Sequence, residues 1–292
     1  MAKFLLLNPF ARRLVAIADE TLGYSLIDRY RTAEADYSEF ERIAFLVTCL
    51  ALAQWSEDAW GTRAEVCAGP SFGGTPAAVY SGALGLPDAL RMTAEWGRRI
   101  EEYFSREHRD VVTQSCARLP EDLLAEVLAE LAQQGEWYDV ACYVDRDFHM
   151  VSLREGKLDW LQKRLRSAGG LPLYTMRPPM HSDAFRPLRD RVEREVFDGV
   201  RFDDPTIPVV SDHDGTVLTS GDEVRTMLLD GMVRPVRWLA VVETLKRNGV
   251  GKLHISGPDN LWGRVRCMTQ NFDIVPIKPR TALQPRHREP VA

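Results

Sequence analysis

Apolar residues along the chain follow two spacings, which together predict a mixed α/β protein. Short continuous apolar runs predict buried strands, one over residues 1–7 and one around Val66. Apolar positions three or four residues apart predict amphipathic helices instead. The helices predicted in this way near the start of the chain cover 14–21, 37–55, 75–84 and 88–105.

A compact run of alternating elements follows and is typical of a ferredoxin-like domain. Its predicted order is strand, helix, strand, strand, helix, strand. These elements cover 111–117, 120–133, 138–144, 149–153, 156–167 and 172–176. The α/β pattern then resumes with strands at 207–211 and 252–256 and helices at 223–229, 238–248 and 260–268.

We therefore expect an α/β chain with two domains. A large α/β-hydrolase-like domain with a nucleophile elbow comprises residues 1–108 and 178–278. A ferredoxin-like (βαββαβ) small domain, 109–177, is inserted into it. The proline-rich residues 279–292 are expected to form a loose C-terminal tail.

Composition narrows the class of protein. The chain has 292 residues, of which 45% are hydrophobic and 27% charged, as in ordinary globular domains. Its net charge of −5 argues against a general nucleic-acid partner. The longest apolar stretch, 43–55, is too short to span a membrane, and Asn8-Pro9 ends the first apolar run too early for a signal peptide. Five scattered cysteines lack metal-ligand spacing, so we expect a cytoplasmic protein with reduced thiols, no metal and no cofactor.

Ser71 is the candidate nucleophile. It lies in Gly69-Pro70-Ser71-Phe72-Gly73, directly after the predicted strand around Val66 and before a predicted helix. A strand that turns sharply into a helix holds a serine on a strained elbow with its hydroxyl exposed. The pattern Gly-x-Ser-x-Gly is short, and an ordinary glycine-serine turn after a strand explains it as well.

A serine nucleophile needs a base, and six histidines are available. His181 follows the small domain directly, where the chain returns to the large domain and a cleft is expected. The alternatives are weaker. His108 and His287 are expected to be solvated, His254 to be a structural residue of a core strand, His213 to lie in a turn and His149 at the start of a small-domain strand.

In this order, the motifs resemble the malonyl-CoA:acyl carrier protein transacylase family, including the acyltransferases of polyketide synthesis. The matching segments are the elbow, Met180-His181-Ser182 at 110 residues after the serine, Pro208-Val209-Val210-Ser211, Pro235-Val236-Arg237-Trp238 and Gly257-Pro258-Asp259. By this resemblance Ser71 is the nucleophile and His181 the base of a dyad. The resemblance also implies that a backbone carbonyl near Gly231 orients the histidine and that the Phe72 N–H stabilises the oxyanion.

The resemblance also implies the partners. The acyl donor is a thioester of CoA or of an acyl carrier protein, and the acceptor is the thiol of an acyl carrier protein. Because carrier proteins are acidic, a basic docking face is expected. Its candidates are Lys163, Arg164, Arg166, Arg186, Arg189, Arg191 and Arg194, although each is equally well explained as a solvated residue paired with nearby acids.

Two departures from the family concern the elbow. The N-terminal glycine-glutamine loop that supplies a second oxyanion donor is missing, and the corresponding stretch contains Phe10 and Ala11. A backbone N–H of either residue is a possible substitute donor. The residue before the serine is Pro70 where the family has histidine.

The third departure concerns the substrate. Malonyl-type members carry an arginine about 25 residues after the serine, where this chain has Trp96. An indole cannot neutralise a carboxylate, whereas a guanidinium pairs with it through two hydrogen bonds. Pro179 and Met180, just before the base, also differ from the family segment. We therefore expect a substrate pocket that includes Trp96, Met180 and Pro179 and takes a non-malonyl group, as in trans-acting members that load such groups.

The expected function is thus acyl transfer through acyl-Ser71 in polyketide, antibiotic or related secondary metabolism. Three alternatives remain open at this point. One is a malonyl transferase in which Arg98 or Arg99 replaces the missing arginine. The others are an editing hydrolase and a non-catalytic scaffold that binds carrier proteins.

Overall fold

The first residues of the chain form a helix and not the predicted strand. In the computed structural model, which describes residues 1–33, 38–259 and 261–284, α1 covers Ala2–Leu7 and buries Phe4 and Leu5. The prediction was wrong because a short apolar run does not distinguish a buried strand from one face of a helix. The Asn8 side chain caps the next helix, α2 (Pro9–Leu22), by accepting the N–H groups of Phe10 and Ala11.

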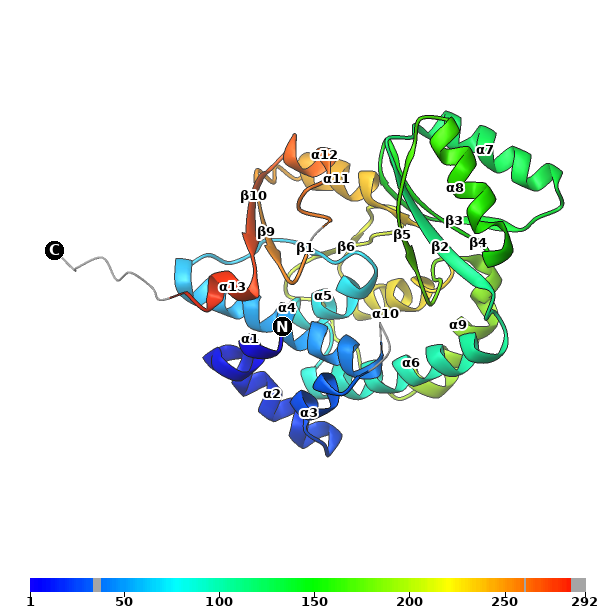
Figure 1. Ribbon diagram of the computed structural model, residues 1–292. Helices are drawn as coiled ribbons and strands as arrows, with labels where there is room; N and C mark the ends of the chain where they lie inside the picture. Colours follow the sequence, from blue (N-terminus) through cyan, green and yellow to red (C-terminus); the bar gives the residue numbers. More distant parts are fainter. Residues whose placement is uncertain (34–37, 260, 285–292) are drawn as a thin grey trace.

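Helices form one wall of the large domain (Figure 1). α4 (Glu39–Trp60) packs between α2 and α6 (Leu86–Arg106), and α3 (Leu26–Arg31) packs on its outer side. The middle of α4 is buried nearly all round, whereas α6 is amphipathic with its apolar stripe toward the core. The helices predicted at 37–55 and 88–105 are therefore confirmed with longer boundaries.

The large domain contains two small sheets. In the first, β1 (Cys67–Ala68) pairs in parallel with β6 (Val209–Val210), which pairs antiparallel with β7 (Val217–Leu218). In the second, β9 (Lys252–Ser256) pairs in parallel with β10 (Asp273–Ile277). Within the described part of the chain, β1 and β9 are each at the edge of their sheet.

The small domain has the predicted ferredoxin-like order (Figure 1, green). It runs β2 (Val111–Ala117), α7 (Glu121–Gln133), β3 (Tyr138–Asp145), β4 (Phe148–Arg154), α8 (Leu158–Ser167) and β5 (Leu171–Met176), with a short helix η2 (Glu155–Lys157) before α8. The sheet order β5-β2-β4-β3 places the first and third strands of the motif, β2 and β4, between the other two. α7 and α8 cover one face with a leucine-rich core.

One strand of the large domain joins the small-domain sheet. β8 (Val236–Arg237) pairs in parallel with β3, so the residues around it are held between the two domains. The helices between the small domain and β8 are η3 (Asp183–Phe185), α9 (Arg186–Val192), η4 (Glu193–Phe197) and α10 (Gly221–Asp230), with β6 and β7 between the last two. α11 (Trp238–Arg247) follows β8.

The end of the chain is more ordered than expected. Residues 279–282, predicted to belong to a loose tail, form the short helix α13 (Pro279–Ala282), whose Ala282 carbonyl accepts a hydrogen bond from the Asn8 side chain. The helix predicted at 260–268 is reduced to α12 (Arg266–Thr269), and the strand β10 was not predicted. Residues 285–292, including His287, lie outside the described residues.

Candidate active site

Ser71 lies on a strained turn between a strand and a helix, as predicted for a nucleophile elbow. β1 ends at Ala68, the 3-10 turn η1 covers Ser71–Gly73, and α5 (Gly74–Tyr80) starts immediately after it. The backbone φ of Ser71 is +52°, in the left-handed region that residues other than glycine rarely adopt. The turn is tight enough to require glycine, because a Cβ at Gly69 would lie 1.9 Å from the Gly73 carbonyl oxygen.

His181 is in hydrogen-bond contact with the serine. Its Nε2 lies 2.8 Å from Ser71 Oγ, although the two residues are 110 positions apart in the sequence. The other ring nitrogen, Nδ1, lies 3.2 Å from the backbone carbonyl oxygen of Arg234. A carbonyl can only accept, so Nδ1 carries the proton and Nε2 is left to accept the serine hydroxyl. This is the arrangement required of a nucleophile and its general base.

The carbonyl that orients the histidine belongs to Arg234, which corrects the prediction of Gly231. Gly231 lies at the end of α10, where its N–H continues the helix by bonding to the Met227 carbonyl. Arg234 comes three residues later, beyond the last turn of that helix and just before β8. Sequence spacing located the segment but not the residue, because the position of the helix end decides which carbonyl is exposed.

The surroundings of His181 favour its neutral form. Desolvation lowers the pKa of His181 to about 4, while the nearby Asp212 carboxylate acts in the opposite direction. A neutral imidazole is the form that accepts a proton, so His181 is in its basic form throughout the neutral pH range.

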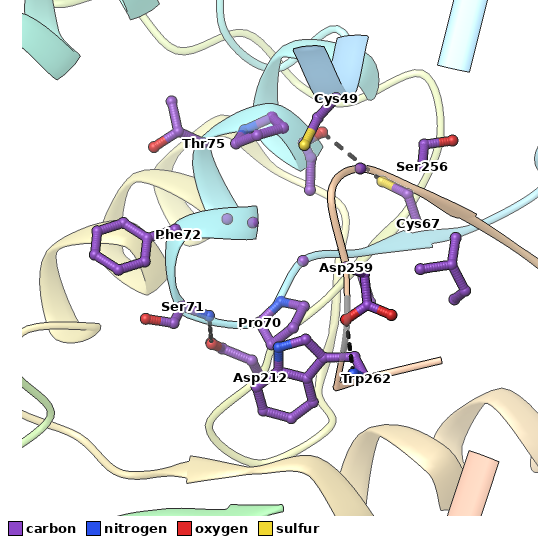
Figure 2. Close-up of a pocket in the computed structure, with 18 of the residues that line it drawn as sticks. Cys49, Cys67, Pro70, Ser71, Phe72, Thr75, Asp212, Ser256, Asp259 and Trp262 are labelled. Carbon is purple, nitrogen blue, oxygen red and sulfur yellow. Dashed lines mark hydrogen bonds between the residues drawn. The ribbon is translucent and has the colours of Figure 1, made fainter. Parts of the chain in front are cut away.

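Asp212 is a site residue that the sequence analysis missed. Its Oδ2 accepts the backbone N–H of Ser71 at 2.7 Å, a contact visible in Figure 2. The side chain is buried, and its other oxygen lies 3.4 Å from Nδ1 of His213. The sequence analysis weighed His213 in this turn, but the acidic residue before it is the one that contacts the elbow. The strands β1 and β6 are parallel and end at the same sheet edge, so the residues that follow them lie close together. Predicting this pairing from the sequence would have pointed to Asp212.

The predicted substitute donors for the oxyanion are occupied elsewhere. The N–H groups of Phe10 and Ala11 bond to the Asn8 side chain at the start of α2, so neither replaces the missing loop. The Ser71 N–H is likewise committed to Asp212. Phe72 directly follows the serine in η1, and its N–H stays the predicted oxyanion donor.

A cavity of about 1300 Å³ opens beside the dyad. It extends between β1 and β9, the two edge strands, and its walls include Cys49 of α4 on one side and Trp238 of α11 on the other. The strands β1 and β9 belong to separate sheets, and residues of both strands and of the helices α4 and α11 line this one cavity. Figure 2 shows Ser71, Phe72 and Asp212 on one wall and Trp262 and Asp259 on another.

Two of the three predicted pocket residues line this cavity. Trp96 and Met180 line the cavity, whereas Pro179 is buried away from it and its neighbour Pro178 takes that place. Two polar atoms of α6, Thr93 Oγ1 and Trp96 Nε1, are buried at this wall with no hydrogen-bond partner among the described residues.

Two arginines, Arg42 and Arg63, line the cavity, but the arginines that follow Trp96 on α6 do not. Arg98 pairs with Glu95, and Arg99 pairs with Glu95 and Glu195, and neither lines the hollow. Arg42 of α4 does line it, with its guanidinium carbon 4.5 Å from the centre of the Phe72 ring.

Comparisons with known proteins find similarity to acyltransferases. A family model described as the VinK acyltransferase small domain matches residues 115–176. The malonyl CoA-acyl carrier protein transacylase of Escherichia coli (strain K12) is 25% identical over 256 residues, covering 86% of this chain and 81% of that protein. The corresponding protein of Bacillus subtilis (strain 168) is 25% identical over 277 residues, covering 92% and 86%.

Solved structures show the same fold. The malonyl CoA-acyl carrier protein transacylase from Coxiella burnetii superposes with a TM-score of 0.84 at 23% identity, covering 97% of this chain and 91% of that one. PlMCAT, solved with its type II PKS acyl-carrier protein, gives a TM-score of 0.82 at 22% identity, covering 96% and 92%. This chain is therefore similar in sequence and in fold to malonyl CoA-acyl carrier protein transacylases over most of its length. The mixed α/β fold with a ferredoxin-like small domain is therefore confirmed.

The remaining described histidines contact residues other than Ser71, although His254 lines the same cavity. His149 donates from Nε2 to the Leu119 carbonyl inside the small domain, and His213 donates to the Met227 carbonyl. His254, on β9, packs against the ring of Trp60 at the end of α4. His108, predicted to be solvated, instead packs among aromatic rings that include Phe185.

Other nucleophiles and metal sites were also considered. Burial raises the pKa of Cys67, the cysteine of β1, to about 12, so its thiol is protonated and unreactive at neutral pH. Over residues 1–33, 38–259 and 261–284 no group of three His, Cys, Asp or Glu side chains is placed to hold a metal ion. No helix in the same ranges is both long and apolar enough to cross a bilayer.

Most of the predicted docking arginines are paired with acids. Arg164 pairs with Glu130, Arg186 with Asp183, and Arg191 with Glu102. The explanation of these residues as locally paired side chains therefore holds for several of them, and a basic docking face stays a prediction.

Proposed function

We propose that this protein is an acyltransferase that moves an acyl group through Ser71 to the thiol of an acyl carrier protein. The observation that carries the proposal is the 2.8 Å contact between Ser71 Oγ and a His181 Nε2 that is left to accept a proton. The names of its curated relatives, malonyl CoA-acyl carrier protein transacylases, support this reaction class and this acceptor.

The reaction proceeds in two half-reactions with one covalent intermediate. Ser71 Oγ attacks the thioester carbonyl carbon while His181 Nε2 takes the hydroxyl proton. The tetrahedral intermediate collapses, the carbon–sulfur bond breaks, and the departing thiolate takes the proton from His181. The acceptor thiol then gives its proton to His181 and attacks the carbonyl carbon of the acyl-Ser71 ester. The bond between that carbon and Ser71 Oγ breaks, and the serine oxygen takes the proton back from His181. The Phe72 N–H, at the start of the short η1 turn, is the proposed donor to the oxyanion in both steps.

The Arg234 carbonyl orients His181, as a carboxylate orients the histidine of a catalytic triad. By accepting the Nδ1 proton at 3.2 Å, it fixes the ring orientation and the tautomer. A neutral carbonyl stabilises the imidazolium formed during each step less than a carboxylate does. A buried negative charge nearby is therefore useful, and Asp212 supplies one.

The proposed acyl group is uncharged at the end distant from the thioester. Trp96, which by the resemblance replaces the malonyl-binding arginine, lines the cavity, and Arg98 and Arg99 are paired with glutamates away from it. Burial of a neutral polar group without a hydrogen-bond partner costs about 2–7 kcal/mol. Burial of an unpaired carboxylate costs more, because the group is charged. The unpartnered Trp96 Nε1 and Thr93 Oγ1 favour a neutral chain with hydrogen-bond acceptors.

One observation favours a second candidate, malonyl transfer with a displaced arginine. Arg42 lies over the Phe72 ring and lines the same cavity, so it is the guanidinium best placed to meet a substrate carboxylate. Replacement of Arg42 by glutamine discriminates between the candidates. Malonyl loading falls strongly in this variant if Arg42 binds the malonyl carboxylate, whereas loading of neutral acyl groups stays near that of the wild type.

The proposed setting is polyketide, antibiotic or related secondary metabolism in the cytoplasm, with the acyl donor on CoA or on a carrier protein.

The test is a transfer assay with a neutral acyl thioester and an acyl carrier protein that bears its thiol arm. We expect the carrier protein to become acylated on its thiol arm by the wild-type enzyme. The Ser71→Ala variant is expected to transfer no acyl group. Accumulation of free acid with or without the acceptor would identify an editing hydrolase instead. Equal function of wild type and Ser71→Ala in the producing cell would identify a scaffold.

A further inference from the structure

The turn after β6 lies directly against the nucleophile elbow. β1 and β6 are parallel and in register, with Ala68 opposite Val210, so both strands end at the same sheet edge. The elbow follows β1 and the turn 211–215 follows β6. The turn is closed by the Gly215 N–H, which donates to the Ser211 carbonyl. Gly215 itself has a φ of +74°, and a Cβ there would meet the Ala240 carbonyl oxygen at 2.5 Å.

Asp212 uses this position to hold the backbone of the serine. Its Oδ2 accepts the Ser71 N–H at 2.7 Å, and the residue is only 5% exposed. Ser71 has a left-handed φ that costs of order 1–3 kcal/mol and persists only when neighbouring groups enforce it. A charge-assisted hydrogen bond to the amide of the strained residue is such an enforcing contact.

The same carboxylate is close enough to the general base to act on its charge. Asp212 and His181 both contact Ser71, one at its amide and the other at its hydroxyl. The negative charge of Asp212 raises the pKa of His181 against the stronger effect of desolvation, and His213 lowers it. Asp212 and His213 are the charged or titratable side chains that act on His181, and Cys142 of β3 faces Asp212 from the small domain.

His213 lies directly beside the carboxylate of Asp212. His213 Nε2 donates to the Met227 carbonyl, so its Nδ1 is the nitrogen that lies 3.4 Å from Asp212 Oδ1. Both side chains are almost completely buried. Asp212 therefore has one oxygen on the elbow amide and the other on an imidazole, with no described cation paired to it by a short contact.

We propose that Asp212 is a positioning residue with two effects, fixing the strained Ser71 backbone through its amide and stabilising the imidazolium of His181 by its charge. The inference rests on the proposed role of the Ser71–His181 dyad. Asp212 does not touch the imidazole or the reacting carbonyl. In a site where a main-chain carbonyl orients the histidine, it contributes the negative charge that a triad carboxylate contributes elsewhere.

The test replaces the charge while keeping the acceptor. In Asp212→Asn the amide oxygen still accepts the Ser71 N–H, and the amide group has His213 Nδ1 as its own acceptor. The rate of Ser71 labelling by a fluorophosphonate is measured across the acidic and neutral pH range, because this probe needs the dyad but no acyl substrate. Asp222→Asn, which removes one charge from an exposed position on α10, is the matched control.

We expect the acid limb of the Asp212→Asn profile to move to lower pH by about one unit, because loss of a nearby negative charge lowers the pKa of the base. The plateau rate falls about threefold to tenfold. Asp222→Asn matches the wild type in both. An unmoved acid limb in a folded Asp212→Asn overturns the electrostatic effect, and an unchanged plateau overturns the proposal as a whole.

The outcome is separable from the proposed function. If wild-type Ser71 is not labelled at all, the dyad assignment fails before Asp212 is tested. If it is labelled but Asp212→Asn behaves like the wild type, only the role of Asp212 fails. Asp212→Ala, which removes both charge and acceptor, is expected to lose labelling more severely than Asp212→Asn, and equal rates for the two variants contradict the backbone effect.

Discussion

Ser71 and His181 meet at 2.8 Å, and both have left-handed backbone conformations, with φ of +52° and +65°. Each strained residue is held by a neighbouring contact. Asp212 accepts the Ser71 amide, and Ser182, directly after the histidine, donates from its hydroxyl to Asp139 of the small domain at 2.6 Å. The dyad is therefore assembled by contacts that come from several distant parts of the chain.

The elbow leaves no space for a side chain at Gly69. We expect Gly69→Ala to lower the free energy of unfolding by about 1–3 kcal/mol and to abolish fluorophosphonate labelling, because the new Cβ would collide with the Gly73 carbonyl. Urea denaturation and labelling measure the two effects. Gly156→Ala is the control, since nothing lies within 4 Å of a Cβ there. A fully active Gly69→Ala contradicts the described elbow geometry.

The contact between Ser182 and Asp139 connects the catalytic loop to the small domain. In Ser182→Ala the buried hydroxyl is lost, and we expect a loss of about 1–3 kcal/mol in unfolding free energy together with slower labelling of Ser71. Ser167→Ala, which removes an exposed hydroxyl at the end of α8, serves as the control. Labelling of Ser182→Ala at the wild-type rate would show that His181 is positioned without the small domain.

The depressed pKa of His181 makes stability depend on pH. The unfolded chain protonates this histidine near its ordinary value of about 6.5, whereas the folded chain does so only near 4. Stability is thus lost as the pH falls from about 6.5 to about 4, by roughly 3 kcal/mol for the full shift. We expect His181→Gln to flatten the dependence of unfolding free energy on pH in this window. An equally steep dependence in the variant contradicts the burial of a neutral His181.

Much of the fold was predictable from local patterns. The ferredoxin-like domain has a clear sequence of strands and helices, and its order emerged correctly. The N-terminal strand failed because Met1–Leu7 has the composition of either element, and only the cap at Asn8 indicates a helix boundary. α13 was missed because its four residues depend on packing against distant parts of the chain.

The candidate site divides in the same way. Ser71 could be predicted from a local turn motif, and His181 from its place directly after the small domain together with the family resemblance. Arg234 could not, because the orienting group is a main-chain carbonyl without a side-chain signature. Asp212 needs the pairing of β1 with β6, and Arg42 needs the packing of α4 over the elbow, neither of which is written in a short segment.

The side chain at position 96 is proposed to determine the charge of the accepted acyl group. We expect Trp96→Arg to increase malonyl loading relative to loading of neutral acyl groups about tenfold to a hundredfold, the range of a charge-assisted hydrogen bond to a carboxylate. Trp96→Phe is the control, because it keeps an apolar ring against Phe197 but removes the indole N–H. This variant should still prefer neutral acyl groups over malonyl. The preference is measured by competition between the two thioesters. No change of preference in Trp96→Arg places the acyl chain elsewhere in the cavity.

The most direct test of the account is the mass of the intact protein after brief exposure to single acyl thioesters. The panel includes malonyl-CoA and neutral acyl groups of increasing size, and His181→Ala is run in parallel. We predict a covalent adduct on Ser71 with at least one neutral acyl group, formed faster than with malonyl-CoA and slowed about 10²- to 10⁴-fold in His181→Ala. An adduct with malonyl-CoA alone, or an adduct that survives Ser71→Ala, would contradict it.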